Sequence, residues 1–487
     1  MELKEKKLGD IRNSLDKLLM NLEEKSDKGF KITEVERHLF SQLLSLGLQL
    51  LSYYIFLVNQ LVRASGPPQD ISGKKMRNSG SSTRSYLSVF GMLKIERHKY
   101  HSAYHKFIHY SLDARLGLPP GRYSYVLTDW LAYGAVEMDF GESAKQLERV
   151  LGHHLSGMQS SRQTYHLSGE VASFYAHREW SGVDDGTHLS VGYDGKGIPI
   201  IRSQTDRQAD SPAVRLSKGQ KKGVKKEATI SVSSSFTPKT RSKEDILAAL
   251  FQAGPGKVSS RPTHQWHENK HIRAFLSEKT RAIDYGTDNL LSRDVTGKKP
   301  IVVLIDGDRA LEKAVRETCR ERQIEHRVDA YILDFIHLLE YVWKVANAHL
   351  GENSLQREQW VRGQAELLLD SQHELVLGQW KGLLENQKLS KNGRYNIERA
   401  ITYIGNRPHM LDYRSYLQKG YPITTGVVES ACGHFIKSRM DRNAMHWGKQ
   451  GAQDMLNIRA VKKNNDWNGY MEYFIRNEQN NIYNAVA

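Results

Sequence analysis

The stretch KPIVVLIDGDRALEKAV, residues 299–315, decides the fold class. Its apolar run 301–305 is mostly β-branched and lies between a proline and a glycine, which is typical of a strand buried on both faces. Asp306 and Asp308 follow, and then the apolar spacing predicts a helix. This order places a carboxylate at the carboxyl end of a central strand, where α/β sheets hold their chemistry. The alternative is an acid that only caps the next helix.

Composition indicates the class of partner. The chain has 487 residues, with 70 lysines and arginines against 55 acids, so its formal charge is +15. This excess predicts a polyanionic partner, nucleic acid before membrane; the alternative is a basic protein without such a partner. Only two cysteines are present, which excludes a disulfide scaffold and a cysteine-rich zinc site.

The N-terminus predicts a cytoplasmic protein. MELKEKKLGD carries charges where a signal peptide has an apolar segment. The most apolar run, residues 43–57, is interrupted by Gly47, Gln49 and Ser52, and it is shorter than the roughly 20 residues that a membrane span needs. We therefore expect no membrane partner.

The first third of the chain reads as mostly helical. Residues 1–65 predict a helical bundle or dimerising arm, residues 66–85 a flexible basic linker, and residues 86–110 a short hairpin. Four histidines between residues 98 and 109 match no closed zinc site. Within the helical region 126–175, residues 141–172 resemble a helix-turn-helix with its turn at Gly152 and a polar second helix that carries Arg162. Such side chains suit contacts to a DNA groove and its phosphates.

The second part of the chain alternates strands and helices. HLSVGYDGKGIPIIRS predicts two strands around a glycine-rich turn, with Asp194 at the end of the first. The basic segment 215–227 is either a solvated loop or one that faces DNA. Residues 228–236 predict a strand, and Ser242 is the expected cap of the next helix. Another short strand closes at Asp334, and residues 338–405 are expected to be helical.

Three acids form the candidate catalytic set: Asp194, Asp306 and Glu429. Carboxylates that converge from strand ends and a helix make an oxygen site for Mg²⁺ or Mn²⁺. Two such ions, about 3.5–4 Å apart, can support in-line phosphoryl transfer. The set has competitors: Asp308 beside Asp306, and Asp184 and Asp185 before Asp194. Lys437, Arg439 and Arg442 follow Glu429 and suit contacts to the scissile backbone.

The motifs YDGKGIPI, VVLIDGDRALEKAV, ILDFIHLLEYVW and TTGVVESACGHFIKSRMDRNAMHW, in this order, resemble bacterial insertion-sequence transposases of the DDE type. The resemblance covers about residues 86–470 and is closest to the ISKra-type group, which is related to Mutator-like transposases. It implies that Asp194, Asp306 and Glu429 bind two divalent metal ions, and that the protein cuts and joins DNA at terminal inverted repeats. It also implies that Asp334 and His337 hold DNA near the site. Relatives often carry cysteines before the segment that here reads LDARLGLPPG, and this chain does not.

The resemblance also implies an α/β catalytic core of the RNase H-like type, a mixed sheet with flanking helices that is interrupted by an all-helical insertion. With the helical N-terminal part, the expected regions are 1–65, the linker 66–85, the DNA-binding region 86–175, the first part of the core 176–337, the insertion 338–420, and the last core helix with the tail, 421–487. The expected partners are double-stranded DNA, at element ends and target, and further copies of the chain as a dimer or larger assembly. The expected location is the bacterial cytoplasm, associated with the nucleoid.

Two other functions stay open. One is a catalytically silent DNA-binding protein descended from a transposase, and the other is a divalent-metal nuclease that hydrolyses without joining. The presence of all three acids and of Lys437 favours activity.

Overall fold

A computed structural model describes residues 2–70, 72–102, 108–179, 185–201, 224–251, 267–294, 296–385, 389–424, 432–442 and 445–483. The chain forms two compact units. Unit 1 comprises residues 1–176 together with 466–487, and unit 2 comprises residues 177–465. The C-terminal tail therefore belongs to unit 1, whereas we had expected it to continue the core.

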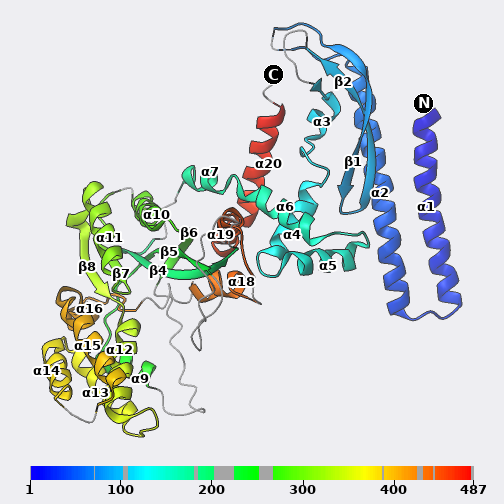
Figure 1. Cartoon of the computed structure of the whole chain (residues 1–487). Helices are drawn as coiled ribbons and strands as arrows, with labels where there is room; N and C mark the ends of the chain where they lie inside the picture. Colours follow the sequence, from blue (N-terminus) through cyan, green and yellow to red (C-terminus); the bar gives the residue numbers. More distant parts are fainter. Residues whose placement is uncertain are drawn as a thin grey trace, which may run out of the picture. The chain divides into compact units, whose positions relative to one another are not determined.

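Unit 1 is mainly helical with one small antiparallel sheet (Figure 1). Its elements are α1 Glu2–Asp27, α2 Ile32–Ala64, β1 Arg77–Ser88, β2 Gly91–His101, β3 Ile108–His109, α3 Ser111–Leu116, α4 Tyr125–Ala135, α5 Phe140–Leu151, α6 Gly157–Ser168, α7 Val171–Ala176 and α20 Trp467–Tyr483.

The helical character predicted for residues 1–65 is confirmed, and the two helices α1 and α2 form a hairpin. By length and composition, α2 alone among the described helices is apolar enough to cross a membrane, so the expectation that no segment qualifies was wrong. Gly47, Gln49 and Ser52 interrupt the apolar run but carry no charge. One such helix near an N-terminus is weak evidence for a span, and the charged helix α1 packs along α2, with Lys7 above the ring of Phe56.

The hairpin β1–β2 begins earlier than expected. Residues 77–85 were expected to lie in a flexible linker, but they form most of β1 and pair antiparallel with β2. A register irregularity between Asn78 and Ser81 accommodates the glycine there. Backbone hydrogen bonds to a neighbouring strand can order a glycine- and serine-rich segment whose side chains bury little area, and composition alone does not reveal that neighbour.

The predicted helix-turn-helix shape is confirmed. α5 ends at Gly152, which adopts a positive φ of 74°, and α6 begins after Ser156, whose side chain accepts a hydrogen bond from the Gln159 amide. The last helix, α20, packs against α7, and Trp467 at its start donates a 2.6 Å hydrogen bond to Asp129 in α4. The helices α4, α5 and α6 pack on one another, and the C-terminal helix is joined to them through α4 and α7.

Unit 2 is an α/β assembly around one mixed sheet. Its elements are β4 His188–Ile200, β5 Val224–Phe236, α9 Lys243–Leu250, β6 Glu268–Leu276, α10 Lys279–Ser292, β7 Ile301–Ile305, α11 Arg309–Glu321, η2 Glu325–Arg327, β8 Val328–Leu333, α12 Phe335–Leu350, α13 Arg357–Leu369, α14 His373–Leu383, α15 Lys391–Gly405, η3 Pro408–Met410, α16 Tyr413–Gln418, the π-helical turn η4 Cys432–Lys437, α18 Ser438–Met440 and α19 Lys449–Lys463.

The sheet has five strands in the order β6-β5-β4-β7-β8. Strand β5 is antiparallel to both of its neighbours, β6 and β4, while β4, β7 and β8 are parallel. All five residues of β7 are buried, as the apolar run 301–305 predicted. Helix α10 packs on β4, β5 and β6, and α19 lies against the edge strand β6. The side chains of Gln453 and Asn464 accept hydrogen bonds from backbone amides of β6. The α/β core is therefore confirmed as a mixed sheet with flanking helices.

The glycine-rich turn expected after Asp194 does not exist. β4 is one continuous strand that pairs with β5 along its whole length, and neither Gly195 nor Gly197 has a positive φ. A Cβ added to Gly195 would lie 2.9 Å from the carboxylate of Glu227 on β5. The glycines therefore make room for cross-strand side chains rather than for a turn.

Helices α12 to α16 form the predicted all-helical insertion after β8. They gather in one group beside β7 and β8 (Figure 1). Trp380 is completely buried in this group, while Trp343 and Trp360 are partly buried against the same core. Helix α9 begins at the predicted cap Ser242 and also packs on the insertion.

Candidate active site

Three aspartates follow one row of neighbouring residues across the parallel part of the sheet. In this row Tyr193 of β4 pairs with Ile305 of β7, which pairs with Leu333 of β8. The next residue on each strand is an acid: Asp194, Asp306 and Asp334. β7 and β8 end directly before their acids, whereas β4 continues past Asp194 to Ile200. The three aspartates therefore lie in one row at the carboxyl ends of β7 and β8, a row called the acid edge below.

Asp306 occupies an unfavourable environment for a negative charge. Burial raises the pKa of its carboxyl group above the usual range, and the nearby charge of Asp194 raises it further. A hydrogen bond from the Asp308 amide to Asp306 Oδ1, 2.9 Å long, and the charge of His337 lower that pKa again. The structure thus brings Asp194 and Asp306 close enough for their charges to interact.

Asp308 has a structural role that separates it from Asp306. Its Oδ1 accepts hydrogen bonds from the amides of Ala310 and Leu311 and so caps α11. Its Oδ2 lies 2.7 Å from the ammonium of Lys279. Of the two neighbouring acids, Asp308 is the helix cap and Asp306 faces the charge of Asp194.

Asp334 and His337 form an ion pair next to these acids. Asp334 has no exposed surface; its Oδ1 caps α12 by accepting from the Ile336 amide, and its Oδ2 lies 2.9 Å from His337 Nδ1. This carboxylate and that of Asp306 raise the pKa of His337 to about 9. The expectation that Asp334 itself contacts DNA is wrong for this structure, because a fully buried carboxylate offers no surface. It orients His337 instead.

The insertion holds the backbone of the Asp306 loop. Tyr403 of α15 donates a 2.6 Å hydrogen bond to the carbonyl of Asp306, and Arg407 donates to the carbonyl of Gly307. Gly307 has a φ of 89°, and a Cβ there would lie 2.7 Å from the Tyr403 hydroxyl. Neither residue was among the site residues that the sequence predicted. Tyr403 lies in α15 and Arg407 just after it, and no local pattern points to a loop almost a hundred residues away.

Glu429, the third predicted ligand, lies outside the described residues. The chain approaches the acid edge just before it: the carbonyl of Ile423 accepts a hydrogen bond of 2.9 Å from the amide of Phe335, directly after Asp334. After it, the turn η4 is fixed by the buried Arg459 of α19, which donates to the carbonyls of Phe435 and His434. Both flanks of the segment that contains Glu429 are therefore anchored in unit 2.

The basic residues after Glu429 divide into two kinds. The side chains of Lys437 and Arg442 are exposed and can meet a ligand. Arg439 is 1% exposed; its guanidinium lies 4.9 Å from the ring of Trp447 and donates to the sulfur of Met445. The prediction that Arg439 binds DNA is therefore wrong for this structure, and its role is packing.

The remaining predicted site residues are Asp184, Asp185, the basic segment and Arg162. Asp185 precedes β4, at the strand end opposite Asp194, and accepts hydrogen bonds from Ser235 and Asn269. Asp184 and residues 215–223 of the basic segment lie outside the described residues. Arg162 is exposed on α6 of unit 1, in a different unit from the acids.

The acid edge suits a divalent cation. Asp194 and Asp306 carry oxygen donors, and burial together with the nearby charge of Asp194 raises the pKa of Asp306; a bound cation would stabilise the ionised carboxylates. Among the described residues no group of three acid, histidine or cysteine side chains forms a complete metal site; Glu429 is the third ligand that the sequence predicts.

No model of a known protein family matches this chain, and no curated protein is similar to it.

Proposed function

We propose that the protein is a DNA transposase of the DDE type that binds the terminal inverted repeats of an insertion sequence and cuts and joins DNA. One observation carries the proposal. Asp194 and Asp306, chosen from the sequence as metal ligands, follow paired residues on neighbouring parallel strands, and their charges interact. A mixed sheet with flanking helices and a helical insertion after β8 is compatible with the RNase H-like core that the resemblance implies.

The chemistry would be phosphoryl transfer at a site formed by Asp194, Asp306 and Glu429. Two Mg²⁺ or Mn²⁺ ions held there would stabilise the attacking and leaving oxygens. Tyr403 and Arg407 hold the backbone that carries Asp306, which favours a fixed position for its carboxylate. His337, paired with Asp334, is protonated at neutral pH and contributes positive charge beside Asp306.

Binding of DNA would involve other parts of the chain. Lys437 and Arg442 are exposed cations close in sequence to Glu429, suited to the DNA backbone. Arg162 is the exposed cation of the α6 surface in unit 1. With an excess of 15 positive charges, the protein would associate with double-stranded DNA in the cytoplasm, as a dimer or larger assembly on paired ends.

The decisive experiment compares Asp194→Asn, Asp306→Asn and Glu429→Gln with the wild type. The DNA that flanks the gene supplies the candidate ends, which should contain inverted repeats. Each substitution removes one negative ligand but keeps the size, so cutting with Mg²⁺ or Mn²⁺ should fall by orders of magnitude while gel shifts show that the DNA complex still forms.

Asp308→Asn is the matched control. It makes the same change two residues from Asp306, keeps an oxygen that can cap α11, and weakens the pair with Lys279. We expect a stability loss of about 0–1 kcal/mol with cutting preserved. Near-normal cutting by the Asp306 variant, or cutting that persists in excess chelator, would refute the proposal. If the protein is a catalytically silent DNA-binding protein, the wild type should bind DNA without cutting it. If it is a nuclease, it should produce cut ends but no joined products.

A further inference from the structure

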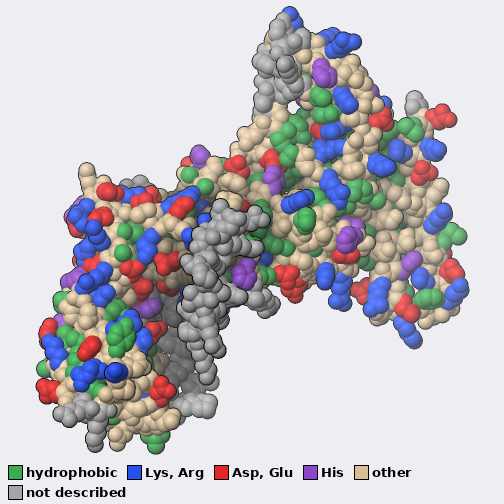
Figure 2. Space-filling model, in the orientation of Figure 1, with side chains coloured by type: hydrophobic (Ala, Val, Ile, Leu, Met, Phe, Trp, Pro, Cys, Tyr) green, Lys and Arg blue, Asp and Glu red, His purple; other side chains and the backbone are tan. Residues whose placement is uncertain are grey.

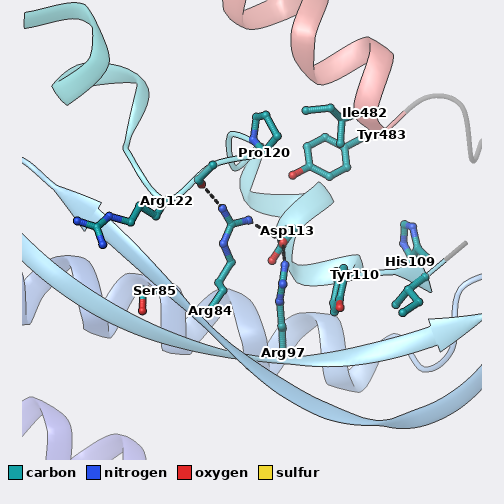
Figure 3. Close-up of a pocket in the computed structure, with 12 residues that line it drawn as sticks. Arg84, Ser85, Arg97, His109, Tyr110, Asp113, Pro120, Arg122, Ile482 and Tyr483 are labelled. Carbon is teal, nitrogen blue, oxygen red and sulfur yellow. Dashed lines mark hydrogen bonds and ion pairs between the residues drawn. The ribbon is translucent and has the colours of Figure 1, made fainter. Parts of the chain in front are cut away.

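Unit 1 contains a cavity of about 600 Å³ that no part of the proposed chemistry uses. It is lined by side chains from the hairpin β1–β2, from the segment between β3 and α4, and from the end of α20 (Figure 3). Its volume lies within the range of about 300–1,000 Å³ that is usual for small-ligand sites. All its described lining residues belong to unit 1, so the cavity can be considered by itself.

The floor of the cavity carries a net positive charge. Arg84 and Arg97 both bind the same oxygen, Oδ2 of Asp113, so two guanidinium charges face one carboxylate. Arg84 is further fixed by the carbonyls of Pro119 and Gly121. The side chains of Arg84 and Arg97 are 11% and 15% exposed, and burial lowers the pKa of both guanidinium groups. An anion would therefore offset a charge that the protein leaves uncompensated.

Two polar atoms of this network have no hydrogen-bond partner among the described residues. They are Oδ1 of Asp113 and Nε of Arg97, both buried. Asp113 as a whole is only 3% exposed. Because buried polar groups are normally satisfied, a buried network beside a cavity with two atoms that lack a partner is a second indication of a site for a polar ligand.

The walls of the cavity are aromatic and apolar. Tyr110 lies against Arg97, with the guanidinium 3.6 Å from the ring centre. Tyr483 and Ile482, at the end of α20, face the arginines from the other side (Figure 3). Arg122 lies at the rim, exposed to solvent. A flat ring system attached to an anionic group matches this combination of aromatic walls and guanidinium groups.

We infer that this cavity binds one unstacked nucleotide of a DNA strand, with its phosphate near Arg122 and Arg84 and its base against Tyr483. The inference rests on the proposed DNA-binding function and adds to it a second contact, separate from the acid edge and from α6. Aromatic stacking and guanidinium groups together are the usual means of holding single-stranded nucleic acid.

The test uses the full chain and a labelled single-stranded oligonucleotide of about 12 nucleotides, followed by fluorescence anisotropy. Tyr483→Leu removes the ring, and we expect about tenfold weaker binding. Tyr483→Phe keeps the ring but loses the hydrogen bond to the Leu118 carbonyl, so it should bind nearly as the wild type. Arg122→Gln should reduce the slope of log affinity against log salt by about 0.7.

Arg115→Gln is the matched control, because Arg115 is an exposed arginine on α3 that does not line the cavity. It should leave affinity and salt slope unchanged. An oligonucleotide with abasic positions should remove the difference between Tyr483→Leu and Tyr483→Phe.

Equal binding by all variants would show that the arginines and Asp113 form only an internal ion-pair network, and would overturn the inference. An effect of Arg122→Gln that persists on abasic DNA, without an effect of Tyr483→Leu, would show a phosphate contact without a base pocket. In both cases the wild type still binds DNA, so the proposed function stands. A wild type that binds no DNA would refute both.

Discussion

The hydroxyl of Tyr403 donates a hydrogen bond of 2.6 Å to the backbone carbonyl of Asp306. The donor lies in the helical insertion and the acceptor at the end of a central strand. Arg407, just after the end of α15, donates to the next carbonyl, that of Gly307, and to the carbonyl of Tyr403. The ring of Tyr403 is stacked 3.9 Å from that of Tyr341 in α12. The insertion therefore fixes the position of a proposed metal ligand.

Tyr403→Phe should show whether this hydrogen bond positions Asp306 for cutting or only stabilises the fold. The variant keeps the stacked ring and loses one hydrogen bond, so the free energy of unfolding should fall by about 1 kcal/mol. Cutting at element ends should fall more, on the order of tenfold to a hundredfold, because a small displacement of a reacting group is costly. Tyr416→Phe is the control: its 3.4 Å bond reaches the carbonyl of Tyr331, away from the acids. Equal losses of cutting in both variants would contradict a positioning role for Tyr403.

The ion pair of His337 with Asp334 predicts how stability depends on pH. The pKa of His337 is about 9 in the folded chain and about 6.5 when unfolded. A raised folded pKa gives stability that is fully present below pH 6.5 and is lost as the pH rises through 9. The side chain is 28% exposed, so after solvent screening we expect about 1–2 kcal/mol.

Chemical denaturation in the presence of a chelator, at pH 6 and at pH 9.5, measures this effect. The wild type should lose more stability over this interval than His337→Gln. His434→Gln, a change of an exposed histidine in η4, should behave as the wild type. If the wild type and the His337 variant lose the same stability, the pair contributes nothing in this range.

The sequence correctly predicted those features that depend only on residues close together in the chain. The apolar run before Asp306 became β7 with every residue buried, and Ser242 caps α9 through the amide of Asp245. Asp306 follows the last residue of β7 as predicted, and Asp194 is next to it in the row, although β4 continues to Ile200 and does not end there. Each confirmed inference needs only a short window of sequence.

Other features depend on partners that are distant in the chain. The glycines after Asp194 signal a turn until the Glu227 side chain of β5 lies against them. Arg439 looks like a DNA contact until Trp447 packs on it. Asp334 is buried because the insertion and β7 surround it; its amide donates to the carbonyl of Ile305. A single sequence contains no measure of such long-range contacts, so these residues could not be assigned from it.

Arg162 should contribute to the binding of duplex DNA. On α6, Gln159 is part of the helix cap, Ser160 is buried and Gln163 accepts a hydrogen bond from Thr128, which leaves Arg162 as the exposed cation. Arg162→Gln should reduce the slope of log affinity against log salt by about 0.9, as expected for one lost phosphate contact. Arg12→Gln, an exposed residue of α1, is the control.

The measurement requires the full chain. A fragment of residues 86–175 would lack α20, which bonds α4 through Trp467 and Asp129 and α6 through Glu478 and His166. A salt slope that Arg162→Gln leaves unchanged, on DNA that the wild type binds, would place the duplex contact elsewhere.

The exposed face of α2 predicts self-association. Phe40, Leu43, Leu50, Tyr54 and Leu61 are each about half exposed, and their spacing is that of a coiled-coil seam. Hydrophobic side chains reach the surface of this hairpin among charged ones (Figure 2). Light scattering after size exclusion should find the wild type as a dimer at micromolar concentration, and Leu50→Lys should shift it to the monomer because a charge in the seam is costly to bury. Gln42→Lys, at an exposed position of the same helix, should stay dimeric. A wild type that is monomeric, or one that binds lipid vesicles through α2 instead, would exclude the seam as the contact between copies.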